Sequence, residues 1–331
     1  MKNHDISVVI PFYNGAVWIE RALKSAFNQS VPAKEVIVVN DGSSADELAA
    51  LELLGEKYPF VLISKPNGGQ GSARNAGVKA ATSEFICFLD QDDFYLPNHN
   101  KVLLSLIPFE KSNFGFAYAD ISRANGDGRV YVTNFIAARA QHPKKELVNL
   151  ISADMYILPT ASIISKAAFE SVGGFDPDLR GYEDDDLFIR MYMMGYANYF
   201  SESSVAVWCI HSSSTTFSIL MKQSRMHYIN NLMGYFDECE IIGDEVFSKL
   251  IYPRFNRLII GDLFKSIVTR DINLHKCIEI FREFKCYVMR DKNMRKITKL
   301  RFALLDLSLD FIPLSAIAVI AKIKPDYFNI L

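Results

Sequence analysis

The apolar segment 85–89 is predicted to be a buried strand, and it is followed directly by Asp90, Gln91, Asp92 and Asp93. An Asp-x-Asp pair at the end of a strand offers hard oxygen ligands to Mg²⁺ or Mn²⁺, ions that keep some water ligands and bridge to substrate phosphates. A helix N-cap or a solvated turn would use the same side chains without a metal. The spacing therefore predicts a divalent-metal site, with a capping turn as the alternative.

A second acidic group precedes the amphipathic segment 187–192 and consists of Glu183, Asp184, Asp185 and Asp186. Consecutive carboxylates repel one another unless a cation or substrate hydroxyls face them. Like-charged neighbours also raise the pKa of a carboxyl group, which suits a general base. The alternative is an acidic first turn of a helix, stabilised by the helix dipole.

A glycine-rich loop at residues 67–72 opens a predicted helix, with Arg74 in its first turn. Successive backbone N–H groups at a helix N-terminus favour an anion. The loop is not a dinucleotide fingerprint, because Arg74 stands where that motif needs Gly or Ala and because the loop follows the third predicted strand. It is not a P-loop either, since no Gly-Lys-Ser/Thr follows. An anion site and a plain turn are both open interpretations.

A histidine, His211, stands before the Ser/Thr run at 212–215. A His beside hydroxyl groups can contact a diphosphate or a metal. A lone His is more often a structural hydrogen-bonding residue, so both interpretations stay open.

Alternating strands and helices must position these groups. Short apolar runs rich in β-branched residues predict strands at 6–10, 35–40, 60–64 and 85–89. Pro11 is expected to end the first strand. Apolar residues at helical spacing predict helices at 16–28, 46–58 and 73–81. This order predicts an α/β fold with a mostly parallel central sheet flanked by helices, whose ligands bind beyond the carboxyl ends of the strands.

The later part of the chain has a different pattern. Two further strands are predicted at 116–121 and 129–135. Helices are expected after residue 217, with breaks at Gly243, Pro253 and Pro313.

The composition limits the class of protein. A chain of 331 residues, 50% hydrophobic and 22% charged, is neither disordered nor fibrous and can bury a large core. A net charge of −2 argues against a nucleic-acid partner. Five widely spaced cysteines without a Cys-x-x-Cys pair favour a reducing compartment. Since no uncharged apolar stretch reaches the ~20 residues of a membrane span, we expect a cytoplasmic protein.

Several segments together resemble a known family in their order and spacing: residues 7–14, 39–44, 67–77, 88–93, 173–176, 183–187 with Arg190, and His211 with its Ser/Thr run. They resemble the family-2 inverting glycosyltransferases of GT-A fold, a Rossmann-like α/β architecture. The resemblance covers about residues 6–216. It implies a GT-A domain over residues 1–216, followed by a helical C-terminal extension over 217–331.

The resemblance implies a nucleotide-diphospho-sugar donor, usually UDP-linked. By position in the motifs, Pro11, Tyr13 and Asp41 would hold the uracil. Arg74 would lie near the base or ribose, and Asp90 would contact the ribose.

The resemblance also implies Mn²⁺ or Mg²⁺ as cofactor and an acceptor hydroxyl as nucleophile. Asp92 would bind the metal, and His211 would support the metal or the diphosphate. Asp184 would be the catalytic base, with Glu183 beside it at the acceptor. Asp185 adds a carboxylate where the family often has an aromatic residue, which leaves open whether Asp184 alone is the base.

The function implied is metal-dependent, inverting transfer of a hexosyl or N-acetylhexosaminyl group to a glycan or lipid-linked glycan, in surface polysaccharide or lipopolysaccharide biosynthesis. One alternative is a nucleotide-sugar-binding module without turnover. Another is a nucleotidyltransferase, which usually has a glycine-rich basic loop after its first strand, where this chain has Pro11, Phe12, Tyr13 and Asn14.

The C-terminal region contains a basic cluster. Seven Lys or Arg and one acid, Asp291, lie between Lys285 and Arg301, and an apolar stretch follows at 302–323. This combination suits peripheral contact with anionic lipid at the inner face of the cell membrane. A solvated helix face, an acceptor contact or contact between subunits of a homo-oligomer are the alternatives.

Overall fold

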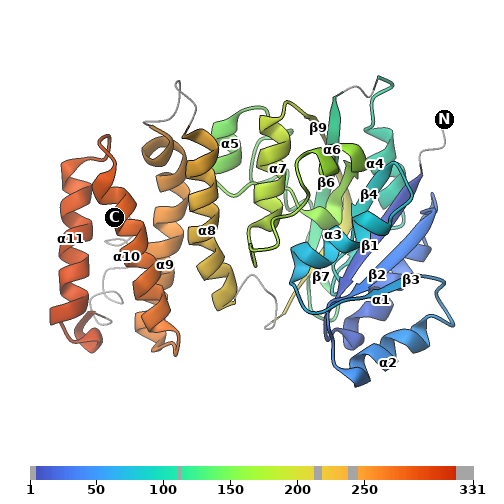
Figure 1. The fold of residues 1–331 in the computed structure, drawn as a ribbon, viewed down its shortest axis with the longest axis horizontal. Coiled ribbons are helices and arrows are strands. Elements are labelled where there is room, and N and C mark those ends of the chain that lie inside the picture. Colours follow the sequence, from blue (N-terminus) through green and yellow to red (C-terminus); the bar gives the residue numbers. More distant parts are fainter. Residues whose placement is uncertain (1–4, 111–112, 212–217, 238–244, 318–331) are drawn as a thin grey trace. The chain divides into compact units, whose positions relative to one another are not determined.

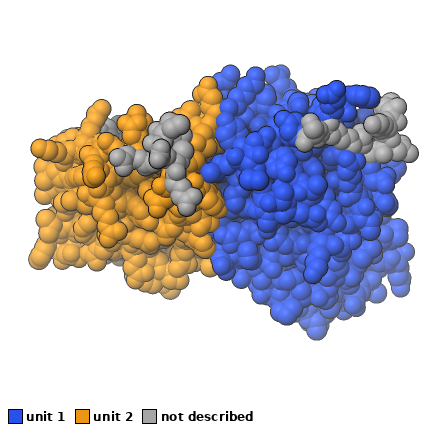
Figure 2. Space-filling view, turned by 45° about the horizontal axis from the view of Figure 1, so that its top comes forward, with its two compact units in different colours: residues 1–145, 156–214 blue, residues 146–155, 215–331 orange. Residues whose placement is uncertain are grey.

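The computed structural model describes residues 5–110, 113–211, 218–237 and 245–317. The chain forms two compact units, coloured separately in Figure 2. The first contains residues 1–145 and 156–214, and the second contains residues 146–155 and 215–331. The short segment 146–155 therefore groups with the C-terminal unit, although it precedes the boundary at 216 that the sequence suggests.

The first unit is built on a nine-stranded sheet in the order β3-β2-β1-β4-β8-β6-β9-β5, with β7 paired to β6 (Figure 1). Its strands are β1 (Ile6–Phe12), β2 (Glu35–Asn40), β3 (Val61–Ser64), β4 (Phe85–Phe88), β5 (Phe94–Tyr95), β6 (Phe114–Asn125), β7 (Val130–Val132), β8 (Ser162–Ser165) and β9 (Ala197–Ile210). Strands β3, β2, β1 and β4 are mutually parallel, at the positions that the sequence predicts.

Beyond β4 the sheet is mixed rather than parallel. β8 pairs antiparallel with both β4 and β6, β6 runs parallel to β9, and β9 is antiparallel to β5. The strand predicted at 116–121 is longer, and the one predicted at 129–135 is reduced to three residues. Strands β5, β8 and β9 were not predicted, because β5 and β8 are short and the polar residues 201–204 interrupt β9.

Strand β1 continues through Pro11 to Phe12, contrary to the expectation that the proline ends it. Its pairing with β4 covers Ile6 to Val9 only, whereas Pro11 is in register with Val39 of β2. The missing N–H of the proline is tolerated because Pro11 lies beyond the segment that pairs with β4.

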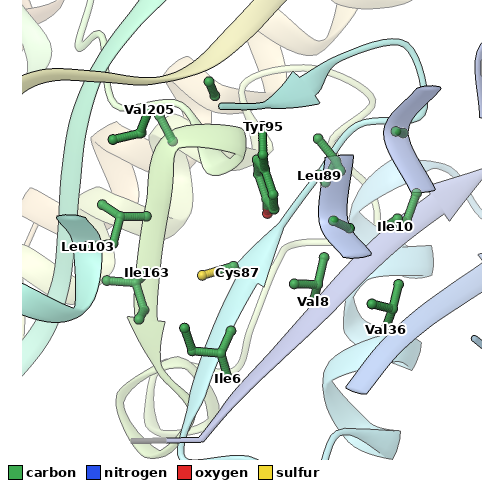
Figure 3. Packing of buried hydrophobic residues seen from close by; sticks show 14 of the residues in the cluster. Ile6, Val8, Ile10, Val36, Cys87, Leu89, Tyr95, Leu103, Ile163 and Val205 are labelled. Carbon is green, nitrogen blue, oxygen red and sulfur yellow. The ribbon is translucent and has the colours of Figure 1, made fainter. Parts of the chain in front are cut away.

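Helices cover the sheet of the first unit: α1 (Ala16–Phe27), α2 (Ala45–Leu54), α3 (Gln70–Ala80), α4 (His99–Ser105), α6 (Lys166–Ser171) and α7 (Glu183–Met193), with a 3₁₀ turn η1 (Pro159–Ala161). Alternate β1 residues such as Val8 and Ile10 share one core with Leu23 of α1. Figure 3 shows Val8 beside Cys87 of β4 in this core, with Ile10 nearer to Leu89. On the other face α3 approaches closely, because a Cβ on Gly77 would lie 2.3 Å from Val9 Cγ1.

The second unit is helical: α5 (Leu147–Ile151), α8 (Ile219–Phe236), a π-helical turn η4 (Val246–Ile251), α9 (Tyr252–Thr269), α10 (Leu274–Arg290) and α11 (Lys296–Phe311). Pro253 does not break a helix, contrary to the prediction, but lies in the first turn of α9. At that position a backbone N–H would have no hydrogen-bond partner within the helix, so proline is tolerated. Pro313 follows the end of α11, as predicted, and Gly243 lies outside the described residues. Within the described ranges, no helix is long and apolar enough to span a bilayer.

Candidate active site

The glycine-rich loop is held by an acidic side chain that follows β2. Asp41 is buried, and its carboxylate accepts hydrogen bonds from the backbone N–H groups of Gly68 at 2.9 Å and Gly69 at 2.7 Å. The Lys65 ammonium lies 2.6 Å from the same carboxylate. Gly69 adopts a φ of +85°, which L-residues rarely take. The anion at this loop is therefore a carboxylate of the chain itself, which fixes the start of α3 beside the end of β2.

Helix α3 carries a buried arginine that joins three elements. Arg74 is 2% exposed and donates to Asp90 Oδ1 at 2.6 Å and to Glu183 Oε1 at 3.1 Å. Gln70, one turn earlier, donates to the same Asp90 oxygen at 2.7 Å. The guanidinium also lies 5.2 Å from the ring centroid of Phe175. Because a buried cation requires such partners, these ion pairs tie α3 to the residue after β4 and to the start of α7.

The first carboxylates of α7 have different surroundings. Burial raises the pKa of Glu183, and the nearby Arg74 charge opposes that rise. Asp184 keeps partial exposure, and burial together with the charges of Asp185 and Glu183 raises its pKa well above the ordinary value. A carboxylate that is accessible and has a raised pKa is suited to accept a proton from a hydroxyl group.

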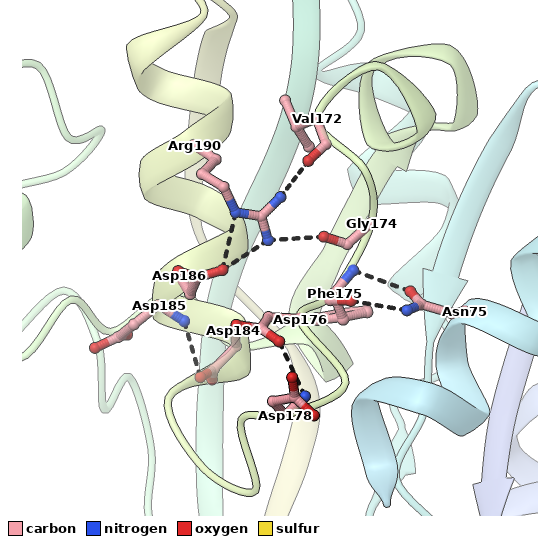
Figure 4. Close-up of polar contacts among 10 residues, drawn as sticks. All are labelled: Asn75, Val172, Gly174, Phe175, Asp176, Asp178, Asp184, Asp185, Asp186 and Arg190. Atoms are coloured by element: carbon pink, nitrogen blue, oxygen red, sulfur yellow. Dashed lines mark hydrogen bonds and ion pairs between the residues drawn. The ribbon is translucent and has the colours of Figure 1, made fainter. Parts of the chain in front are cut away.

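A third carboxylate of this helix, Asp186, is structural. It is fully buried and accepts from Arg190 Nε at 2.9 Å and Nη2 at 2.7 Å (Figure 4). The same guanidinium donates to the carbonyl of Gly174 at 2.7 Å and to the carbonyl of Val172. The pair therefore holds the loop after α6 against α7.

The same loop is fastened to α3 from its other end. Asn75 donates to the Phe175 carbonyl at 2.8 Å and accepts from the Phe175 N–H at 2.9 Å, as Figure 4 shows. Tyr182, just before α7, has a left-handed φ of +65°, an uncommon conformation for a non-glycine residue that tends to occur at functional sites. Arg74 and Asn75 of α3 thus hold the start of α7 and the loop that precedes it.

The acidic group after β4 contributes a second paired site. Asp92 Oδ2 lies 2.8 Å from His211 Nε2, which follows β9. The His211 ring stacks on Trp18 of α1 with centroids 4.5 Å apart. Arg21 donates to the backbone carbonyl of Asp92 and to that of Gly126. These contacts orient the carboxylate and the imidazole toward one another from three separate segments.

The next aspartate, Asp93, holds the fold together. It is buried, and it accepts from the Cys209 N–H at 2.8 Å and from the Thr160 hydroxyl at 3.2 Å. Burial, with the charges of Asp92 and Asp90, raises its pKa well above the ordinary value. Asp93 therefore links β4 to β9 rather than facing a ligand.

Gln91, between the two aspartates, binds the loop after β1. It accepts from the Tyr13 N–H at 2.9 Å and donates to the Tyr13 carbonyl at 3.1 Å. The Tyr13 backbone is thereby fixed while its side chain stays 49% exposed.

The pair of Asp92 and His211 has the chemistry of a divalent-metal site. Burial and, next, the charge of Asp90 raise the pKa of Asp92, and a cation would relieve this repulsion. Carboxylate and imidazole both bind Mn²⁺. Within the part of the chain that the structure covers, no group of three or more His, Cys, Asp or Glu could hold a metal. The pair fits an ion that takes its other ligands from phosphate and water.

The structure brings most of the predicted site residues into direct contact: Arg74 with Asp90 and Glu183, and Asp92 with His211. Pro11 instead lies buried within β1. The hydroxyl run at 212–215 lies outside the described residues.

Sequence reasoning missed three residues that position the site: Gln70, Asn75 and Gln91. All three lie inside the motifs that carry the family resemblance, so their place in those motifs was the available signal. Their partners are distant in sequence, since the Asn75 amide bonds a residue 100 positions later.

The chain is similar in sequence to known glycosyltransferases. The family model described as Glycosyl transferase family 2 matches residues 7–173. Chondroitin synthase of Pasteurella multocida is 28% identical over 225 residues, which cover 68% of this chain and 22% of the synthase. Hyaluronan synthase of Pasteurella multocida has the same identity and coverage. The chain thus spans about a fifth of the length of these curated relatives.

A solved structure shares the fold. TarS 1–349 of S. aureus, in complex with UDP-GlcNAc, has a TM-score of 0.63 and 19% sequence identity, covering 87% of this chain and 81% of TarS 1–349. The mixed sheet with a helical C-terminal region is therefore a GT-A-type architecture. Because the family match extends over half of the sequence and includes the loop after β1, Asp41, Arg74 and the acidic group after β4, this chain belongs to glycosyltransferase family 2.

Proposed function

We propose that this chain is an inverting glycosyltransferase that moves a sugar from a UDP-sugar to a hydroxyl group of a glycan or lipid-linked glycan. The observation that carries the proposal is the set of contacts from Asp90 through the buried Arg74 to Glu183, beside which Asp184 lies with a raised pKa. These contacts join the residues that the family resemblance assigns to the donor with those it assigns to the acceptor. Family membership supports sugar transfer, and UDP-GlcNAc bound to TarS supports a UDP-linked donor.

In this proposal the donor lies against the loop after β1. The Tyr13 ring is half exposed and its backbone is fixed by Gln91, so the ring contacts the uracil. Pro11 and Asp41 are buried and shape the base pocket. Asp90, held by Arg74, accepts from the ribose hydroxyls.

Asp184 is the proposed general base that activates the acceptor. Its carboxylate removes the proton from the acceptor hydroxyl while that oxygen forms a bond to the anomeric carbon. The bond from the anomeric carbon to the diphosphate oxygen breaks from the opposite side, UDP leaves with the electron pair, and the configuration inverts. Burial and the charges of Asp185 and Glu183 raise the pKa of Asp184, which makes its carboxylate a stronger base. Glu183, paired with Arg74, orients the start of α7 and faces the acceptor.

Asp92 and His211 are the residues that would hold Mn²⁺ or Mg²⁺. A divalent ion there supplies charge stabilisation for the diphosphate leaving group. The contribution of the chain is to fix the two side chains, through the stack of His211 on Trp18 and the bond from Arg21 to the Asp92 backbone.

The names of two relatives support a glycan acceptor. Two of them are named as synthases of the glycan polymers chondroitin and hyaluronan. A glycan hydroxyl is therefore the proposed acceptor, and surface polysaccharide or lipopolysaccharide biosynthesis is the proposed role.

The test is a transfer assay with a panel of UDP-sugars, beginning with UDP-GlcNAc, and oligosaccharide acceptors in the presence of Mn²⁺. We expect acceptor-dependent UDP release and a product whose anomeric configuration, measured by NMR, is opposite to that of the donor. Asp184→Asn serves as the control for base catalysis. A product with retained configuration would refute the mechanism, and UDP binding without turnover across the panel would favour a binding module.

A further inference from the structure

Helix α11, red in Figure 1, has two apolar faces. One face is buried through Phe302 and Leu305. The Phe302 ring packs against Phe281 and Phe284 of α10, with ring centroids 5.6 Å and 6.1 Å apart. This face packs α11 against α10 within the second unit.

The other face is an exposed stripe whose side chains are between 52% and 81% accessible. Its members are Ile297, Leu300, Leu304, Leu307 and Phe311. At about 100° per residue they fall within an arc of about 80°, centred nearly opposite Phe302 and Leu305. A helix that is apolar on two faces normally has both faces buried. The exposed stripe therefore indicates contact with a second apolar surface.

A cluster of cations adjoins one end of the stripe. Its members, all exposed, are Arg290, Lys292, Arg295 and Lys296. They lie between the end of α10 and the first turn of α11, immediately before Ile297. An apolar stripe that continues into a group of exposed cations is the arrangement of a helix that lies in a lipid interface.

The acids near the other end of α11 do not complement these cations. Asp306 accepts from Arg282 at 2.8 Å and also pairs with Lys285, and Asp310 pairs with Arg282. These pairs hold α11 on α10, and they lower the pKa of Asp306 despite its partial burial. If α11 of a second copy packed antiparallel on the stripe, its cation cluster would face acids that are already paired. If it packed in parallel, the two cation clusters would face each other and repel.

We propose that α11 binds in the plane of an anionic lipid surface, with the stripe in the acyl boundary and the cation cluster at the headgroups. The proposal uses only the second unit and none of the residues of the sugar-transfer site. It therefore stands or falls independently of the proposed function.

The test is co-sedimentation of the full chain with vesicles of phosphatidylcholine, with and without phosphatidylglycerol, at low and high salt. We expect binding to the anionic vesicles that weakens with salt. Replacing the cation cluster by Gln lowers the partition coefficient by roughly five-fold per charge. Leu300→Ser with Leu304→Ser and Leu307→Ser lowers it by about ten-fold or more, because the stripe then loses its apolar contact.

The matched control is Ile272→Ser, an 89% exposed apolar residue of the same unit outside α11, which leaves vesicle binding unchanged. All variants change exposed side chains, and thermal unfolding followed by circular dichroism checks that they fold. Equal binding of the wild type and the triple Leu variant would overturn the proposal. So would a wild-type dimer that ignores vesicles and becomes a monomer in the triple variant, since a second copy would then cover the stripe.

Discussion

Glu183 accepts a hydrogen bond from Arg74 across 3.1 Å, and the next residue on α7, Asp184, is the partly exposed member of the acidic group. The two neighbours therefore have different tasks. Glu183 is held by a buried cation that also binds Asp90, whereas Asp184 has a raised pKa and is accessible to an acceptor. In the proposed mechanism Glu183 therefore orients the start of α7, and Asp184 accepts the proton.

The separation predicts unequal effects of two isosteric substitutions. Asp184→Asn removes the proton acceptor and lowers kcat by about 10²–10⁴-fold, with UDP affinity largely kept. Glu183→Gln keeps a side chain that can still accept from Arg74, so its loss in kcat is smaller. Steady-state kinetics of both variants with one donor and one acceptor measure the difference. A larger loss for Glu183→Gln would assign the base to Glu183 instead.

The pH dependence of kcat reports the Asp184 carboxyl group. The base works only when ionised, so activity falls as the pH drops through its raised pKa, above the ordinary range for Asp. Asp185→Asn removes one of the charges that raise this pKa. The acid limb of the kcat profile then moves to lower pH. An unmoved limb in the Asp185→Asn profile would mean that another group titrates there.

The buried pair of Asp186 and Arg190 is a stability element. Arg190→Met removes the cation that is paired with the buried Asp186 carboxylate, which costs about 3–5 kcal/mol of unfolding free energy. Combining it with Asp186→Asn removes the buried charge and recovers part of that loss. Urea unfolding measures both variants. The control is Glu20→Gln at the exposed pair with Lys57, which leaves stability nearly unchanged. Equal losses for the single and double variants would show that the charge is not the cause.

Asp92 and Asp93 are adjacent but are predicted to respond differently to Asn. The raised pKa of Asp93 favours its protonated form, which Asn imitates, because Asn can accept from the Cys209 N–H and donate to the Thr160 hydroxyl. Asp93→Asn therefore keeps the fold and UDP binding. Asp92→Asn keeps the fold and loses the effect of Mn²⁺ on UDP binding. Thermal unfolding and binding assays of both variants test this, and a loss of metal dependence in Asp93→Asn alone would reverse the assignment.

The parallel half of the sheet was predictable from sequence because β1, β2 and β4 are short apolar runs that are buried on both faces. The mixed half was not, since β9 contains the polar residues 201–204 and is defined by its pairing with β6. When pairing with a neighbouring strand is what makes a segment extended, the sequence of the segment alone gives little indication of a strand.

The candidate active site was likewise only partly predictable from sequence. The motifs indicated the residue types of the acidic groups, but the partners of each carboxylate depend on the tertiary fold. Asp41 binds backbone groups 27 and 28 positions later, and Asp92 meets His211 across 119 positions. Carboxylates as close in sequence as Asp184 and Asp186 differ in exposure and in partners only because of such tertiary contacts.

The measurement that tests the central claim most directly is calorimetry of UDP binding to the wild type and to Asp92→Ala, with and without Mn²⁺. Asp92 and His211 lie 2.8 Å apart and are the proposed metal ligands, so we predict Mn²⁺-dependent UDP binding that is lost in Asp92→Ala. Binding that is equally strong with and without Mn²⁺, or unchanged in the variant, would contradict the metal assignment. Absence of UDP binding under every condition would contradict the proposed donor site.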